Sequence, residues 1–144
     1  MTNTASSSTR NSARTLVFYD GGCGLCSKEI RHYARLDWAR RIAWVDFSRD
    51  QSLLNDLDLT YDQAMRRLHV LDRDGVMCDG VAAFVAIWTE LPYYRLFARL
   101  VRLFKMVSVL ESAYRPFSAW RYKRRIQSQA CAIPAPDRIG GPLP

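Results

Sequence analysis

The feature that most constrains the fold is the octapeptide Tyr-Asp-Gly-Gly-Cys-Gly-Leu-Cys at residues 19–26. It follows Thr15–Tyr19, a short run of β-favouring apolar residues that predicts a strand. Gly21 and Gly22 break the strand, and from Cys23 onward apolar residues recur at helical spacing. Cys23 and Cys26 are therefore expected on one face of a first helical turn, close enough to form a disulfide.

This placement favours thiol–disulfide chemistry. The unpaired N–H groups at a helix N-terminus favour a thiolate at Cys23, and the thiolate is the reactive form. Cys26, one turn further in, is expected to be more buried and to stay a thiol until it resolves a mixed disulfide. This reaction needs no cofactor. A metal site formed by both residues with Cys78 is a weaker alternative, because the sequence has no second C-x-x-C pair.

The residues around the two cysteines have more than one interpretation. Asp20 is a candidate proton acceptor for Cys26, but the pattern favours a turn carboxylate that binds the amide of Gly21 or Gly22. Gly24 and Leu25 lie between the cysteines and are expected to meet the substrate. Because neither is basic, this pair argues against a strongly oxidising dithiol.

The pattern along the chain predicts a thioredoxin-like α/β fold with a four-stranded mixed sheet, βαβ followed by ββα, and additional C-terminal helices. The strands are expected at 15–19, 42–47, 68–71 and 76–78, the last two as an antiparallel hairpin. An apolar stripe of Leu25, Ile30, Tyr33, Ala34 and Trp38 predicts the first helix. Short helices are expected at 53–57 and after a capping box at 60–63, and longer ones at 80–88 and 94–105.

The last third of the chain is helical and basic. A helix beginning near Ser108 is expected to stop by Pro116, and another is expected over 117–126. Nine Lys or Arg residues lie between 95 and 125, where Glu111 is the single acid, and the whole chain carries a formal charge of +7. This favours a solvated face and leaves open a peripheral contact with an anionic membrane. Nucleic acid is not an expected partner, because no binding motif accompanies the charge.

Length and composition predict one domain over residues 15–127. Residues 1–14 are rich in Ser, Thr and Asn and predict a disordered tail rather than a transit peptide, and residues 128–144 predict a Pro- and Gly-rich tail. No apolar run approaches the ~20 residues of a membrane span. With no signal peptide visible, we expect a cytoplasmic protein, where thiols are mostly reduced.

The octapeptide resembles the signature of the DCC family of thiol-disulfide oxidoreductases, domain of unknown function 393. The family name comes from an Asp and two Cys, matched here by Asp20, Cys23 and Cys26. The resemblance spans roughly residues 15–126 and implies a thioredoxin-like fold. It also implies exchange with a disulfide-bearing protein or small molecule, and recycling by a thiol reductant that the sequence does not identify.

One position departs from ordinary thioredoxins, which carry a cis-proline just before the third strand, facing the dithiol. Here residues 64–68 contain no proline, and a non-proline cis bond costs ~3 kcal/mol. In a thioredoxin-like layout Arg66 and Arg67 would face the dithiol, where they would bind an anionic substrate such as glutathione. The competing function is a non-enzymatic protein that keeps the scaffold and binds a partner or membrane through its basic helices.

Overall fold

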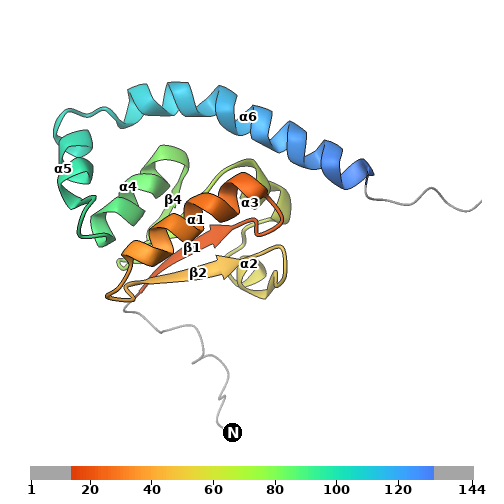
Figure 1. Ribbon diagram of the computed structural model, residues 1–144, viewed down its shortest axis with the longest axis horizontal. Helices are drawn as coiled ribbons and strands as arrows, with labels where there is room; N and C mark the ends of the chain where they lie inside the picture. Colours follow the sequence, from red (N-terminus) through yellow and green to blue (C-terminus); the bar gives the residue numbers. More distant parts are fainter. Residues whose placement is uncertain (1–13, 132–144) are drawn as a thin grey trace, which may run out of the picture.

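Strand β1 (Thr15–Tyr19) is one of the two inner strands of the sheet (Figure 1). The computed structural model describes residues 14–131 and contains a sheet of order β2-β1-β3-β4. The other strands are β2 (Ile42–Asp46), β3 (His69–Leu71) and β4 (Met77–Asp79). β1 pairs in parallel with β2 and antiparallel with β3, and β3 pairs antiparallel with β4. The predicted βαβ unit and hairpin are both confirmed.

Six helices complete the described part of the chain. They are α1 (Gly24–Leu36), α2 (Ser52–Asp56), α3 (Tyr61–Arg66), α4 (Gly80–Glu90), α5 (Arg95–Leu103) and α6 (Val107–Cys131). Because side chains alternate along a strand, Val17 packs with the core that α1 and α4 cover. Phe18 packs on the opposite face with the core that α2 and α3 cover. These two layers on a mixed sheet make the predicted thioredoxin-like α/β fold.

Local turn signals place several elements where the sequence predicts them. The Thr60 side chain accepts from the Gln63 amide, and the Gln63 side chain accepts from the Thr60 amide, so the capping box before α3 is confirmed. Gly75 has φ +79° in the β3–β4 turn, the positive value expected there.

The predicted apolar stripe of α1 is correct for Ile30 and Tyr33, which are buried, and wrong for Leu25, Ala34 and Trp38, which are exposed. The helix ends at Leu36, because the Asp37 carboxylate accepts the amides of Arg41 and Ile42 and turns the chain into β2. Trp38 therefore lies beyond the helix. Leu25 and Ala34 lie on its solvent side.

The prediction of two helices separated at Pro116 is wrong, because α6 is continuous. Proline removes one helical hydrogen bond, but contacts on both sides of Pro116 hold the helix against the domain. The Tyr114 hydroxyl accepts the Leu68 amide, and Arg121 donates to the Met65 carbonyl. Figure 1 shows α6 running across the whole molecule. It continues through 128–131, which the sequence places in the tail, whereas residues 1–13 and 132–144 lie outside the described part.

Candidate active site: a dithiol closed by the last helix

Cys23 and Cys26 occupy the junction between β1 and α1. Cys23 is the N-cap residue of α1, and its amide donates to the Asp20 carbonyl at 3.1 Å. The Cys23 carbonyl accepts the Ser27 amide at 2.9 Å and so begins the helix. Cys26 lies one turn in and is only 7% exposed, whereas Cys23 is half-buried. The predicted difference in burial is confirmed.

The two glycines before Cys23 permit close approaches that a side chain would block. The Gly21 amide donates to Asp46 Oδ1 at 2.9 Å, and a Cβ on Gly21 would overlap the Asp46 carboxylate. A Cβ on Gly22 would overlap the Arg125 guanidinium. A side chain at either position would therefore force the Asp46 or the Arg125 side chain to move.

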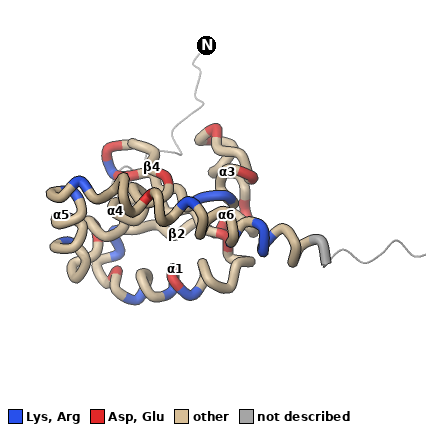
Figure 2. Tube along the Cα trace, turned by 90° about the horizontal axis from the view of Figure 1, so that it is seen from above, with Lys and Arg blue, Asp and Glu red and all other residues tan. Residues whose placement is uncertain are grey.

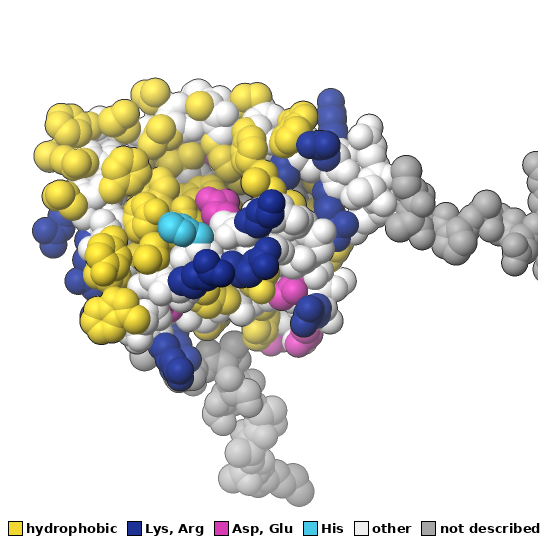
Figure 3. All heavy atoms as spheres, viewed as in Figure 1, with side chains coloured by type: hydrophobic (Ala, Val, Ile, Leu, Met, Phe, Trp, Pro, Cys, Tyr) yellow, Lys and Arg dark blue, Asp and Glu magenta, His cyan; other side chains and the backbone are white. Residues whose placement is uncertain are grey.

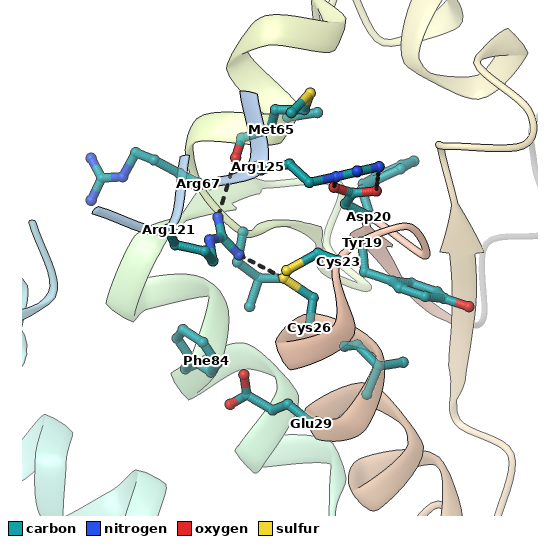
Figure 4. Close-up of a pocket in the computed structure, with 14 residues that line it drawn as sticks. Tyr19, Asp20, Cys23, Cys26, Glu29, Met65, Arg67, Phe84, Arg121 and Arg125 are labelled. Atoms are coloured by element: carbon teal, nitrogen blue, oxygen red, sulfur yellow. Dashed lines mark hydrogen bonds and ion pairs between the residues drawn. The ribbon is translucent and has the colours of Figure 1, made fainter. Parts of the chain in front are cut away.

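Asp20 is buried beside the dithiol and is bonded on two sides. Its Oδ1 accepts the Gly22 amide at 2.9 Å, which confirms the turn interpretation for Gly22. Its Oδ2 accepts Arg125 Nε at 2.7 Å in an ion pair (Figure 4). The positive charge of Arg125 offsets the repulsion that Asp20 would exert on a Cys23 thiolate. A role for Asp20 in accepting the Cys26 proton stays a prediction.

Arg121 of α6 reaches the inner sulfur. Its Nη1 donates to Cys26 Sγ at 3.0 Å. Its Nη2 donates to the carbonyls of Met65 and Arg66, at 3.3 and 3.4 Å. Figure 4 shows the guanidinium between Cys26 and Met65, at the end of α3. A cation from the last helix is thus fixed directly against the dithiol.

The pKa values of the two thiols shift in opposite directions. A hydrogen bond from Cys26 is the main reason that the pKa of Cys23 falls to about 6, and Arg121 lowers it further. The same hydrogen bond, together with burial, raises the pKa of Cys26 well above its usual range. At neutral pH the structure therefore favours a thiolate at Cys23 and a thiol at Cys26.

Glu29 lies one turn beyond Cys26 on the same helix. Both residues line a cavity of about 30 Å³, which has room for a water molecule. Burial raises the pKa of the Glu29 carboxyl, although its Oε1 accepts the Tyr33 hydroxyl at 3.3 Å. In Figure 4 the carboxylate lies on the Cys26 side of α1. This is a second acid beside the dithiol, and the sequence analysis does not single it out.

Arg66 and Arg67 differ in where they point. Arg66 is exposed, and its side chain pairs with Asp62, so only its carbonyl faces the site. Arg67 lines the cavity, but its guanidinium forms ion pairs with Asp79 and Glu111. The described residues contain no cis peptide bond. The cationic group that contacts Cys26 therefore comes from α6 rather than from this loop.

Cys23 also lines an outer groove of about 370 Å³, which shares Arg121 and Arg125 with the cavity. Gly24 and Leu25 line it from α1, as their predicted contact with substrate requires. From α6 it is lined by Trp120 and by Arg124, whose guanidinium lies 4.9 Å from the Trp120 ring centroid. This groove gives access to Cys23 from the solvent.

Two further properties concern only residues 14–131. No cluster of three or more His, Cys, Asp or Glu side chains has the geometry to hold a metal ion there. None of the helices in that range combines the length and the apolar character needed to cross a membrane.

The dithiol and Asp20 can be predicted from the sequence, whereas the roles of Arg121 and Arg125 cannot. The two arginines stand 95 and 105 residues from their partners, inside a basic run that reads as a solvated face. No local signal separates them from Arg124. Glu29 carries a usable signal, since it follows Cys26 by three residues on the predicted helix.

Fold and site together define a thioredoxin-like protein with a closely spaced dithiol at a helix start. The family described as DCC1-like thiol-disulfide oxidoreductase matches residues 17–126. The chain belongs to this family, whose name indicates a thiol-disulfide oxidoreductase. Searches of curated proteins and of solved structures found no match.

The electrostatics predict the pH dependence of Cys23 alkylation. Thiolate is the reacting species, so in a Cys78→Ala/Cys131→Ala background the iodoacetamide rate at Cys23, followed by mass spectrometry, should be half-maximal near pH 6. Cys26→Ala removes the main cause of the low pKa, and the midpoint should then rise toward about 8.5. Cys26→Ser keeps a hydrogen-bond donor, so its midpoint should lie between those two values. An unshifted midpoint in Cys26→Ala would contradict the assignment.

Proposed function

We propose that the chain catalyses thiol–disulfide exchange, with Cys23 as the nucleophile and Cys26 as the resolving thiol. The observation that carries this proposal is the asymmetry of the pair. Cys23 is half-exposed with a pKa of about 6, and Cys26 is buried with a raised pKa. A dithiol in which one sulfur is ionised and reachable while the other is protonated and shielded suits a two-step exchange.

In the first step the Cys23 thiolate attacks one sulfur of a substrate disulfide. The substrate S–S bond breaks, a mixed disulfide forms, and the other substrate sulfur leaves as a thiolate. In the second step Cys26 loses its proton and attacks Cys23 Sγ, which releases the second substrate sulfur. Two electrons pass from the dithiol to the substrate, and a dithiol acting in reverse restores Cys23 and Cys26.

We propose that the substrate reaches Cys23 through the outer groove. Leu25 and Trp120 give it an apolar wall, and Arg124 adds positive charge at its edge. A protein or small-molecule disulfide with an apolar group beside the reacting sulfur fits this lining. The cytoplasm stays the predicted compartment, and the reductant that recycles the pair is identified only as a thiol.

In the second step, we propose that Glu29 accepts the proton that Cys26 loses. Glu29 shares the small cavity with Cys26, so a water molecule there can carry the proton between them. Asp20 is less suited to this task, because Arg125 and the Gly22 amide already bind its oxygens. Asp20 instead holds the turn that presents Cys23.

Redox titration tests the function itself. In thiol buffers of graded potential, alkylation and mass measurement should reveal one two-electron transition confined to Cys23 and Cys26. Cys26→Ser should accumulate mixed disulfides with substrates in a cell extract, and Cys23→Ser, the matched control, should not. A pair that never forms a disulfide would overturn the proposal. An absence of adducts in Cys26→Ser would exclude protein substrates and leave small-molecule disulfides.

Glu29→Gln should separate the two steps of the exchange. With an aromatic disulfide that releases a coloured thiol at each step, the first release should keep its rate and the second should slow by about a hundredfold. The second rate should recover as pH rises, because Cys26 then ionises without help.

Asp20→Asn distinguishes the two carboxylates, and Glu90→Gln, outside the cavity, is the control. If Asp20→Asn slowed the second release and Glu29→Gln did not, Asp20 would be the group that accepts the Cys26 proton.

Arg121→Gln should make the dithiol more reducing. The guanidinium stabilises a thiolate, and only the reduced form has one, so removing the charge should lower the reduction potential by about 30 mV. Arg124→Gln removes the same charge from the neighbouring position and should leave the potential unchanged. Thermal unfolding of both variants checks that the fold is kept. An unchanged potential in a folded Arg121→Gln protein would contradict the role of Arg121.

A further inference from the structure

Helix α5 has two apolar faces, and only one of them is covered. Ala98 and Val101 are 2% and 3% exposed, and they pack against Val81 and Val85 of α4. The other face carries larger side chains that remain in solvent. We call it the apolar row, and it continues into the start of α6. Its members are Leu96, Phe97, Leu100, Leu103, Phe104 and Val109.

The exposure of the row is high for such large side chains. Leu96, Leu103 and Phe104 are 67%, 73% and 66% exposed. Leu96, Leu100 and Leu103 recur at i, i+4 and i+7, so they lie along one stripe of the helix. Figure 3 shows apolar side chains gathered over this end of the molecule. A contiguous apolar surface of this kind marks an interaction site.

Positive charge borders the row on one side. Arg95, Arg99 and Arg102 follow each other on the flank of α5 next to the leucines. Within residues 14–131, Arg99 and Arg102 form no ion pair. Figure 2 shows basic positions along α5 at the end of the molecule.

A hollow of about 320 Å³ lies on the same flank. Five arginines line it, and we call it the arginine hollow: Arg41, Arg73, Arg95, Arg99 and Arg102. The sole acid in its lining, Glu90, is paired with Arg73 at 2.6 Å. The hollow can therefore receive an anion such as a phosphodiester group.

From these features we propose that the apolar row and the arginine hollow dock the protein onto the surface of an anionic membrane. The leucines and phenylalanines enter the boundary between headgroups and acyl chains, and the arginines bind lipid phosphates. A lipid surface supplies both an apolar layer and negative charge in this arrangement. A second copy of this chain would bring the same arginines and its own +7 charge to the contact, which opposes self-association.

The docked orientation leaves the dithiol accessible. α5 lies at the end of the molecule where α1 finishes, and the start of α1, with Cys23, lies toward the other end (Figure 1). His32, nine residues after Cys23, bonds the Tyr94 hydroxyl just before α5. Membrane docking and disulfide exchange therefore use different ends of the protein.

Vesicle flotation of the full chain tests the proposal. We expect binding to vesicles of phosphatidylcholine with phosphatidylglycerol, weakened by salt, and little binding to phosphatidylcholine alone. Arg99→Gln/Arg102→Gln should weaken the partition coefficient by about thirtyfold, since each basic residue near an anionic surface contributes a factor of about five. Leu96→Ser/Leu103→Ser should weaken it by at least about tenfold per leucine.

Two controls distinguish membrane docking from a general effect of charge and from the exchange reaction. Arg31→Gln/Arg35→Gln makes the same charge change on exposed positions of α1 and should cost far less binding than the α5 pair. Cys23→Ala should bind as the unaltered chain does, so failure of docking and failure of the exchange reaction are distinguishable. Three outcomes would overturn the proposal: equal binding to neutral vesicles, binding insensitive to both α5 variants, or a dimer in solution that Leu96→Ser/Leu103→Ser dissociates.

Discussion

The contact between the Arg121 guanidinium and Cys26 Sγ is the interaction on which the site depends. It places a half-buried cation against two cysteines whose anionic form it stabilises. To make this contact, α6 runs across the molecule until it lies beside the first turn of α1. The ion pair of Arg125 with Asp20, one turn further along α6, fixes the same approach. The last helix is therefore part of the dithiol site as well as a cover for the domain.

Much of the fold can be predicted from the sequence because the signals that specify it are local. The strand at 15–19, the Gly-Gly break and the helix after Cys23 follow one another directly along the chain, and each has its own periodicity or turn residue. The capping box and the Gly75 turn are equally short-range. From these elements the order βαβ-ββα follows. The asymmetric burial of the cysteines also follows, because it depends on helix geometry alone.

The missed features depend on contacts between distant segments. Arg121 and Arg124 look alike in the sequence, and only the rotation of α6 puts one against sulfur and leaves the other on a tryptophan ring. The same holds for α5, which has apolar residues on two faces. Helical spacing cannot say which face packs. In the structure the small Ala98 permits close approach to α4, and the leucines are left in solvent.

The segment before β3 has no cis-proline, and its backbone is bonded to α6 instead. In a thioredoxin the chain at that point faces the dithiol and helps to bind the substrate backbone. Here Arg121 donates to the carbonyls of Met65 and Arg66, so α6 is bonded to the chain at that point. With that side closed, the outer groove beside Cys23 remains open to solvent, and α6 forms its wall with Trp120 and Arg124. On the proposed route to Cys23, a substrate would therefore meet side chains of α6 rather than the backbone before β3.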